Sequence, residues 1–152
     1  KANQFTPTSD DLIPTGEYRD VEGTPMDFRQ LKRIGDNIDD DYEPLKQAGG
    51  YDHNYVLDIS RDEVEKVAEL VDESTGRVME IFTDKPGMQF YTANMLTPVE
   101  DGKDGATYGK RTGVCFETQH FPNACNINTF PNSILKAGQE YEYVTIYKFT
   151  CR

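Results

Sequence analysis

The sequence predicts an all-β protein of the sandwich or barrel type, and two observations lead to that prediction. Turn signals rich in Gly, Pro, Asn, Asp and Ser recur at close spacing along the 152 residues. The runs between them are short and rich in aromatic and β-branched residues, which favour strands. Antiparallel sheets packed face to face are typical of such a pattern. The clearest strand candidates are residues 54–57, 77–82, 89–92 and 143–149.

The N-terminal third of the chain offers one loop and one polar cluster. Residues 24–38 are expected to form a loop with irregular turns, because Gly35 opposes a helix there. Residues 49–55 place polar and aromatic side chains, including Asp52, directly after a glycine pair. Such a mixture suits a carbohydrate site, since carboxylates bind hydroxyls and rings cover the apolar face of a sugar. The cluster alone fits a simple turn better, with Asp52 bonded to its own backbone.

The segment 61–71 fits two structures. Residues 60–63 resemble a helix capping box, and apolar residues follow at helical spacing. A strand over 64–71 would instead join the strand at 77–83 through a hairpin turn, in which Gly76 has a natural place. The periodicity by itself does not choose between helix and strand.

Two later stretches carry further candidate site residues. In the strand expected over 113–122, alternation places Glu117 and Gln119 on one face, opposite Phe116 and His120. A carboxylate that projects from an otherwise apolar strand is partly removed from water, which makes it a better general base. Gln89 begins another strand and is flanked by aromatic rings. Each stretch alone is explained more simply by polar side chains that face solvent.

Composition excludes several classes of function. The net charge of −11 repels phosphate backbones and anionic lipid surfaces, so neither nucleic acid nor membrane is an expected partner. No apolar run of membrane-spanning length and no signal peptide are recognised. The three cysteines are odd in number and lack metal-site spacing, which favours a reducing cytoplasm. The opening residues 1–4 look like a segment from the middle of a longer chain.

Several catalytic and cofactor motifs are absent from the sequence. His53 and His120 are the two histidines, and no further ligands at suitable spacing accompany them, so no metal site is predicted. Neither a phosphate-binding loop nor a dinucleotide-binding glycine motif occurs. Cys115 and His120 would point to opposite faces of one strand, which argues against a nucleophile pair.

Taken together, these stretches resemble the aldose 1-epimerase family. The match includes PGMQFYTAN at 86–94 and ETQHFP at 117–122, and it follows the order of the family's motifs over nearly the whole chain. The resemblance favours the strand over the helix at 64–71. The other matching stretches are residues 5–8, 12–17, 23–29, 50–55, 74–78 and 147–149.

The resemblance implies a galactose mutarotase-like β-sandwich of large antiparallel sheets, of which residues 1–152 form roughly the C-terminal half. It implies that the enzyme interconverts the α and β anomers of free aldohexoses such as galactose or glucose without a cofactor. Glu117 matches the family's catalytic base, and Asp52 and Gln89 match residues that hold sugar hydroxyls. The catalytic histidine acid is expected on the N-terminal half, either in the same protein or as a separate chain that completes the domain.

The sequence departs from the family's pattern at Ala93, where glycine is common, and at residues 123–125. Neither departure touches the three residues with implied roles. Two other functions fit parts of the pattern. One is a non-catalytic sugar-binding module that uses Asp52 and Gln89. The other is a sugar-phosphate epimerase, which would need a basic cluster that this sequence barely offers.

Overall fold

The structure is a computed structural model that describes residues 1–60 and 63–152. Strands dominate it, together with one short α-helix and two 3₁₀ turns. In chain order the elements are β1 (Ala2–Thr6), β2 (Arg19–Asp20), η1 (Ile34–Asp36), α1 (Glu43–Ala48), β3 (Asp52–Leu57), β4 (Glu65–Asp72), β5 (Arg77–Thr83), β6 (Gly87–Tyr91), η2 (Lys103–Gly105), β7 (Cys115–Gln119) and β8 (Thr145–Cys151).

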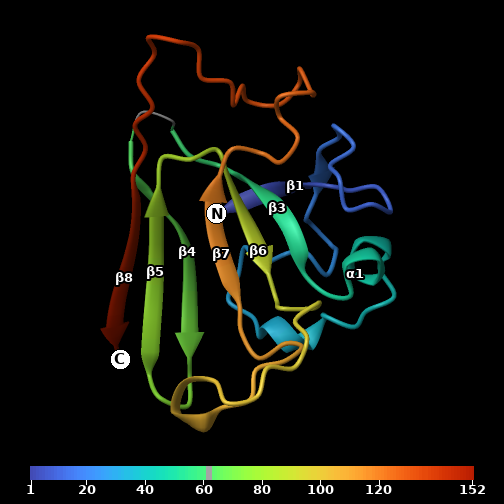
Figure 1. Cartoon of the computed structure of the whole chain (residues 1–152), viewed down its shortest axis with the longest axis vertical. Helices are drawn as coiled ribbons and strands as arrows, with labels where there is room; N and C mark the ends of the chain where they lie inside the picture. Colours follow the sequence, from blue (N-terminus) through green and yellow to red (C-terminus); the bar gives the residue numbers. More distant parts are fainter. Residues whose placement is uncertain (61–62) are drawn as a thin grey trace.

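The strands form two antiparallel sheets. The larger sheet has the order β2-β1-β3-β6-β7, and the smaller has the order β4-β5-β8 (Figure 1). The hairpin β4–β5 lies between β3 and β6 in sequence, yet β3 and β6 pair directly with each other. The predicted all-β architecture of antiparallel sheets is therefore confirmed.

The ambiguous segment after β3 is a strand. β4 pairs along its length with β5, and the turn between them contains Gly76 with a φ of 72°, in the left-handed region that glycine adopts without strain. A bulge between Lys66 and Ala68 interrupts the register. Its extra residue explains why the apolar positions of this strand imitate a helical spacing. Residues 61 and 62 of the possible capping box lie outside the described residues.

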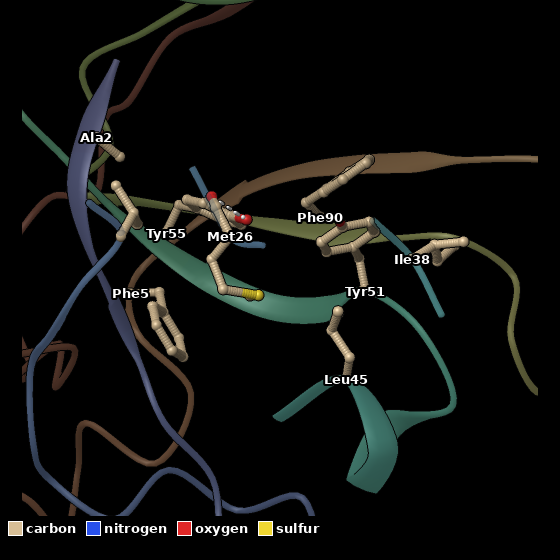
Figure 2. Close-up of a cluster of buried hydrophobic side chains, with 9 residues drawn as sticks. Ala2, Phe5, Met26, Ile38, Leu45, Tyr51, Tyr55 and Phe90 are labelled. Carbon is tan, nitrogen blue, oxygen red and sulfur yellow. Dashed lines mark hydrogen bonds between the residues drawn. The ribbon is translucent and has the colours of Figure 1, made fainter. Parts of the chain in front are cut away.

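The core of the larger sheet is built from aromatic rings. Phe90 stacks on Tyr51 with ring centroids 5.3 Å apart (Figure 2). On its other side, Phe90 stacks on Phe116 with ring centroids 5.1 Å apart. A second cluster joins the two sheets through Leu57 and Met88 on one side and Val67 and Ile81 on the other. One face of the larger sheet therefore packs on the smaller sheet. Phe121, Ala124 and Phe130, from the segment after β7, cover part of its opposite face by packing against Val56 of β3.

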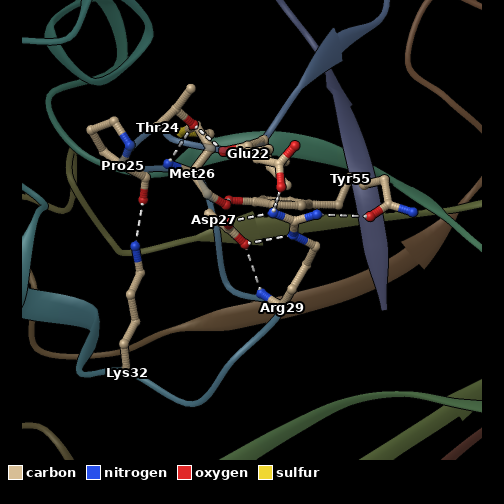
Figure 3. Close-up of polar contacts among 10 residues, drawn as sticks. Glu22, Thr24, Pro25, Met26, Asp27, Arg29, Lys32 and Tyr55 are labelled. Atoms are coloured by element: carbon tan, nitrogen blue, oxygen red, sulfur yellow. Dashed lines mark hydrogen bonds and ion pairs between the residues drawn. The ribbon is translucent and has the colours of Figure 1, made fainter.

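The loop predicted over residues 24–38 is a loop, with the 3₁₀ turn η1 at its end. Ion pairs and hydrogen bonds order it: Arg29 contacts Asp27 at 2.8 Å, Glu22 at 3.2 Å and Asn3 Oδ1 at 3.3 Å (Figure 3). The Arg29 guanidinium lowers the pKa of Asp27 through a side-chain hydrogen bond. Tyr55 of β3 donates a hydrogen bond to the Met26 carbonyl, which ties the loop to the sheet.

Ala93 stands where the family commonly has glycine, and its backbone adopts a conformation that favours glycine. Its φ is 52°, within the left-handed region that costs a residue with a Cβ about 1–2 kcal/mol. The chain leaves β6 here, and the Ala93 carbonyl accepts a hydrogen bond from the Arg111 amide as the chain returns toward β7. The alanine thus keeps the turn at some cost in stability.

The smaller sheet ends in an uncovered strand. β8 pairs with β5, and every residue of β8 is exposed. Phe149 lies opposite Met79, and Tyr147 lies opposite Ile81, so both point to the face that packs on the larger sheet. Phe149 is nevertheless 73% exposed. An open groove of about 1060 Å³ runs between β4 and the larger sheet and is lined by Tyr55, Leu57, Val67, Met88, Phe90 and Phe116 among others.

Candidate active site

The predicted site residues lie on three adjacent strands of the larger sheet. Asp52 begins β3, Gln89 lies in the middle of β6, and Glu117 lies in the middle of β7. Gln89 pairs directly with Glu117 on one side and with Asn54 on the other. Because side chains alternate along a strand, all four project from the face opposite the aromatic core. The structure thus brings together residues that are far apart in sequence.

Hydrogen bonds link the amides and the Asp52 carboxylate of this face. Gln89 Nε2 donates to Asp52 Oδ1 at 2.7 Å. Gln119 Nε2 donates to Gln89 Oε1 at 3.2 Å and to Asn54 Oδ1 at 3.1 Å. We call Thr6, Asn54, Gln89, Asp52, Glu117 and Gln119 the polar row. Its fixed donors and acceptors can bind a ligand that carries several hydroxyl groups.

The environment of Glu117 differs from the one that the sequence predicts. It is exposed, so the expected partial removal of its carboxylate from water does not occur in this chain. The physical reason is that Glu117 lies on β7, the last strand of the sheet, with open space over its face. Two effects raise the pKa of Tyr147: the larger is burial of its hydroxyl, and the smaller is the negative charge of the Glu117 carboxylate. The Tyr147 hydroxyl donates to the Phe116 carbonyl at 2.8 Å, on the free edge of β7.

Sequence reasoning had placed Gln119 beside Glu117 without a role, and it gave Asn54 none. The signal was present in both cases. Asn54 is two residues from Asp52 and Gln119 is two residues from Glu117, so each pair shares one face of its strand. The contacts between the strands depend on register, which the spacing within one strand does not reveal.

The two histidines lie away from the polar row. His53 follows Asp52 but projects into the core, where its ring packs edge-on against Phe5 with centroids 5.7 Å apart. His120 lies just beyond β7, with its Nδ1 3.4 Å from Lys85 Nζ. Lys85 Nζ also lies 3.6 Å from the ring centroid of Tyr143. This cluster fastens the segment before β8 to the larger sheet.

The buried His53 predicts a loss of stability in acid. Burial lowers the pKa of His53 to about 4, whereas an unfolded histidine titrates near 6.5. Between these values the unfolded chain binds the extra proton, so stability is lost as the pH falls from about 6.5 to about 4. We expect His53→Leu, in the full-length protein, to reduce the fall in unfolding free energy between pH 7 and pH 4.5 by about 2 to 3 kcal/mol. Urea titrations at both pH values measure this, and an equal fall in variant and parent would contradict it.

Within residues 1–60 and 63–152, no group of three or more His, Cys, Asp and Glu side chains is arranged to hold a metal ion. In the same part of the chain, no helix is long and apolar enough to cross a membrane. The polar row offers carboxylates, which exchange protons, and amides, which bind hydroxyl groups.

An antiparallel β-domain with a row of carboxylates and amides across one sheet face belongs to the class of proteins suited to polyhydroxylated ligands. Comparison with known proteins identifies the family within this class. A family model described as aldose 1-epimerase matches residues 1–148. The chain belongs to the aldose 1-epimerase family.

Individual relatives agree with this assignment. The chain is 39% identical over 150 residues to the galactose mutarotase of Homo sapiens and 29% identical over 154 residues to the aldose 1-epimerase of Escherichia coli (strain K12). These matches cover 99% and 97% of this chain but 42% and 43% of the relatives. The chain therefore spans less than half the length of the curated relatives it matches.

Solved structures give the same result for the fold. An aldose epimerase homologue from C. elegans superimposes with a TM-score of 0.80 at 25% identity, over 99% of this chain and 44% of that one. A galactose 1-epimerase from Lactobacillus acidophilus superimposes with a TM-score of 0.73 at 23% identity, over 99% of this chain and 42% of that one, and it supports the fold alone. The predicted mutarotase-type fold is confirmed for the part that this chain covers.

Proposed function

We propose that the protein containing this chain is an aldose 1-epimerase that interconverts the α and β anomers of free aldohexoses such as galactose or glucose. The observation that carries the proposal is the polar row, in which Gln89 bonds to Asp52 and lies directly opposite Glu117. Membership of the family supports it, as do relatives whose names state this activity.

In the proposed mechanism, Glu117 removes the proton from the anomeric hydroxyl while an acid donates a proton to the ring oxygen. The bond between C1 and the ring oxygen breaks, and the electron pair of O1 forms the aldehyde carbonyl. Rotation about C1–C2 and closure by the reverse proton transfers give the other anomer. Asp52 and Gln89 hold the sugar by its hydroxyls. Each proton-transfer group of this kind contributes about 10²–10⁴-fold to the rate.

The proposal assigns the acid to a histidine on the remaining part of the domain. His53 is unsuited to this role because it is buried in the core and keeps its proton only below about pH 4. We further propose that residues 1–152 form the C-terminal part of the domain and that the N-terminal part, in the same protein or as a separate chain, completes the site. The groove between the sheets and the uncovered β8 support that completion.

We also propose a cytoplasmic location. Cys115, Cys125 and Cys151 support this proposal, because they are free thiols on the surface of the described chain and suit a reducing compartment.

The activity is tested by polarimetry. Fresh α-D-galactose is dissolved with and without the full-length protein, and the approach of optical rotation to equilibrium is followed in the same buffer. We expect the protein to accelerate the approach without changing its end point, because a catalyst leaves the anomeric equilibrium unchanged. A folded full-length protein that accelerates neither galactose nor glucose mutarotation above the buffer rate would refute the proposal.

A further inference from the structure

We propose that Gln119 is a positioning residue for sugar binding: it fixes the amide of Gln89 so that Nε2 faces Asp52 and offers its remaining hydrogen to a sugar hydroxyl. The inference rests on the proposed function. Gln119 Nε2 reaches Gln89 Oε1 at 3.2 Å and Asn54 Oδ1 at 3.1 Å, so both of its amide hydrogens are used.

The sense of these hydrogen bonds is set by Asp52. A carboxylate oxygen can only accept, so Gln89 must present Nε2 to Asp52 Oδ1, and its Oε1 then faces Gln119. Gln119 must therefore donate to Gln89 Oε1 through its own Nε2. A reversed Gln89 amide would place two oxygens in contact at 2.7 Å, an arrangement that repels.

We call the hydrogen-bonded series Asp52, Gln89, Gln119 and Asn54 the relay. Its Asn54 end is buried, and both polar atoms of the Asn54 amide have partners. Asn54 is 2% exposed, accepts from Gln119 through Oδ1 and donates through Nδ2 to Thr6 Oγ1 at 3.4 Å. Gly87 makes this approach possible, since a Cβ at that position would lie 2.5 Å from Asn54 Oδ1. An unpaired buried amide destabilises the folded protein, so these hydrogen bonds hold Asn54 and, through it, Gln119 in place.

The relay gives the site a defined polarity. Gln89 Oε1 accepts from Gln119 and faces away from Asp52, so the second hydrogen of Nε2 is the group that Gln89 offers to the sugar beside Asp52. Asp52 meets the sugar as an acceptor through Oδ2, which no residue in the described part of the chain engages by a hydrogen bond. A sugar hydroxyl can accept from one and donate to the other, which binds it in a single orientation.

The test is a double-mutant cycle in the full-length protein with Gln119→Met and Gln89→Met, since methionine keeps the length of glutamine and removes its donors. We expect Gln119→Met to lower kcat/KM for galactose mutarotation about tenfold, mainly through KM. In the Gln89→Met background the same change should have little further effect, because Gln119 acts through Gln89. Equal effects of Gln119→Met in both backgrounds would overturn the proposal.

A second measurement needs neither sugar nor activity. The side-chain amide resonances of ¹⁵N-labelled glutamine are recorded, and those of Gln89 are assigned from their loss in Gln89→Met. Gln119→Met should raise their solvent exchange and lower their heteronuclear NOE. The matched control is Gln4→Met, since Gln4 lies on the same sheet face and bonds to Asp20 at 2.9 Å outside the relay.

The two measurements separate the inference from the function on which it rests. Unchanged Gln89 resonances in Gln119→Met, or the same change in Gln4→Met, would overturn the relay. A parent protein without mutarotase activity, whose Gln89 amide still loosens in Gln119→Met, would refute the proposed function and leave the relay standing.

Discussion

Replacing Glu117 by glutamine is expected to lower kcat for galactose mutarotation by about 10²–10⁴-fold in the full-length protein. Glutamine keeps the shape of the side chain but cannot accept the proton of the anomeric hydroxyl. Glu117 is exposed on β7 and makes no hydrogen bond to the rest of the polar row in the described structure, so the change removes a base without breaking a buried contact. Polarimetry with α-D-galactose measures the rate, and unfolding in urea should show nearly unchanged stability.

The matched control for this variant is Glu142→Gln, the same chemical change at another exposed carboxylate remote in sequence from β7. It should retain the parent rate, which excludes a general effect of reduced negative charge. A Glu117→Gln protein with the parent kcat would remove Glu117 from the mechanism, and a loss of equal size in Glu142→Gln would point to the overall charge.

The second large effect concerns the completeness of the domain. Produced alone, residues 1–152 are expected to aggregate or to give poorly dispersed NMR spectra, whereas the completed domain should be soluble and well ordered. An exposed apolar edge strand such as β8 invites pairing with other chains, and the open groove of about 1060 Å³ between the sheets is lined in part by apolar side chains, which favours association.

A substitution at Phe149 distinguishes burial by the missing part from simple insolubility. Phe149 is 73% exposed here but faces the side of the sheet that carries Met79 and Ile81. We expect Phe149→Ala to improve the solubility of the isolated chain and to destabilise the completed domain by about 3 kcal/mol. Well-dispersed spectra from the isolated parent chain, or an unchanged unfolding free energy in the completed variant, would contradict this expectation.

Local patterns predicted the strands of the fold well and its irregular parts less well. Aromatic and β-branched residues between turn signals located β5, β6 and β8 to within a few residues. The helix α1 was missed, although Pro44 near its start and Gly49 at its end, with a φ of 67°, are signals that delimit short helices. β1 was missed because residues 2–4 carry no β-branched or aromatic side chain, and it is a strand because β3 pairs with it.

In the candidate site, the sequence predicts which residues of one strand share a face, but not which residues of neighbouring strands lie side by side. That Glu117 and Gln119 share a face follows from the period of a strand. That Gln89 lies between Asp52 and Glu117 depends on the register of β3, β6 and β7, which long-range packing decides. The resemblance to the family supplied the three residues together, and their catalytic and binding roles stay predictions until the variants are measured.

The direct pairing of β3 with β6, around the intervening β4–β5 hairpin, bears on how this chain can vary in length. A shift of β6 by one residue would exchange Gln89 and Phe90 between the two faces of the sheet. Such a change of register would remove Gln89 from the polar row and Phe90 from the aromatic core together. The hairpin turn between Asp72 and Arg77 lies outside that register. Insertions and deletions should therefore accumulate at such turns, while the segment from Gly87 to Tyr91 keeps its frame.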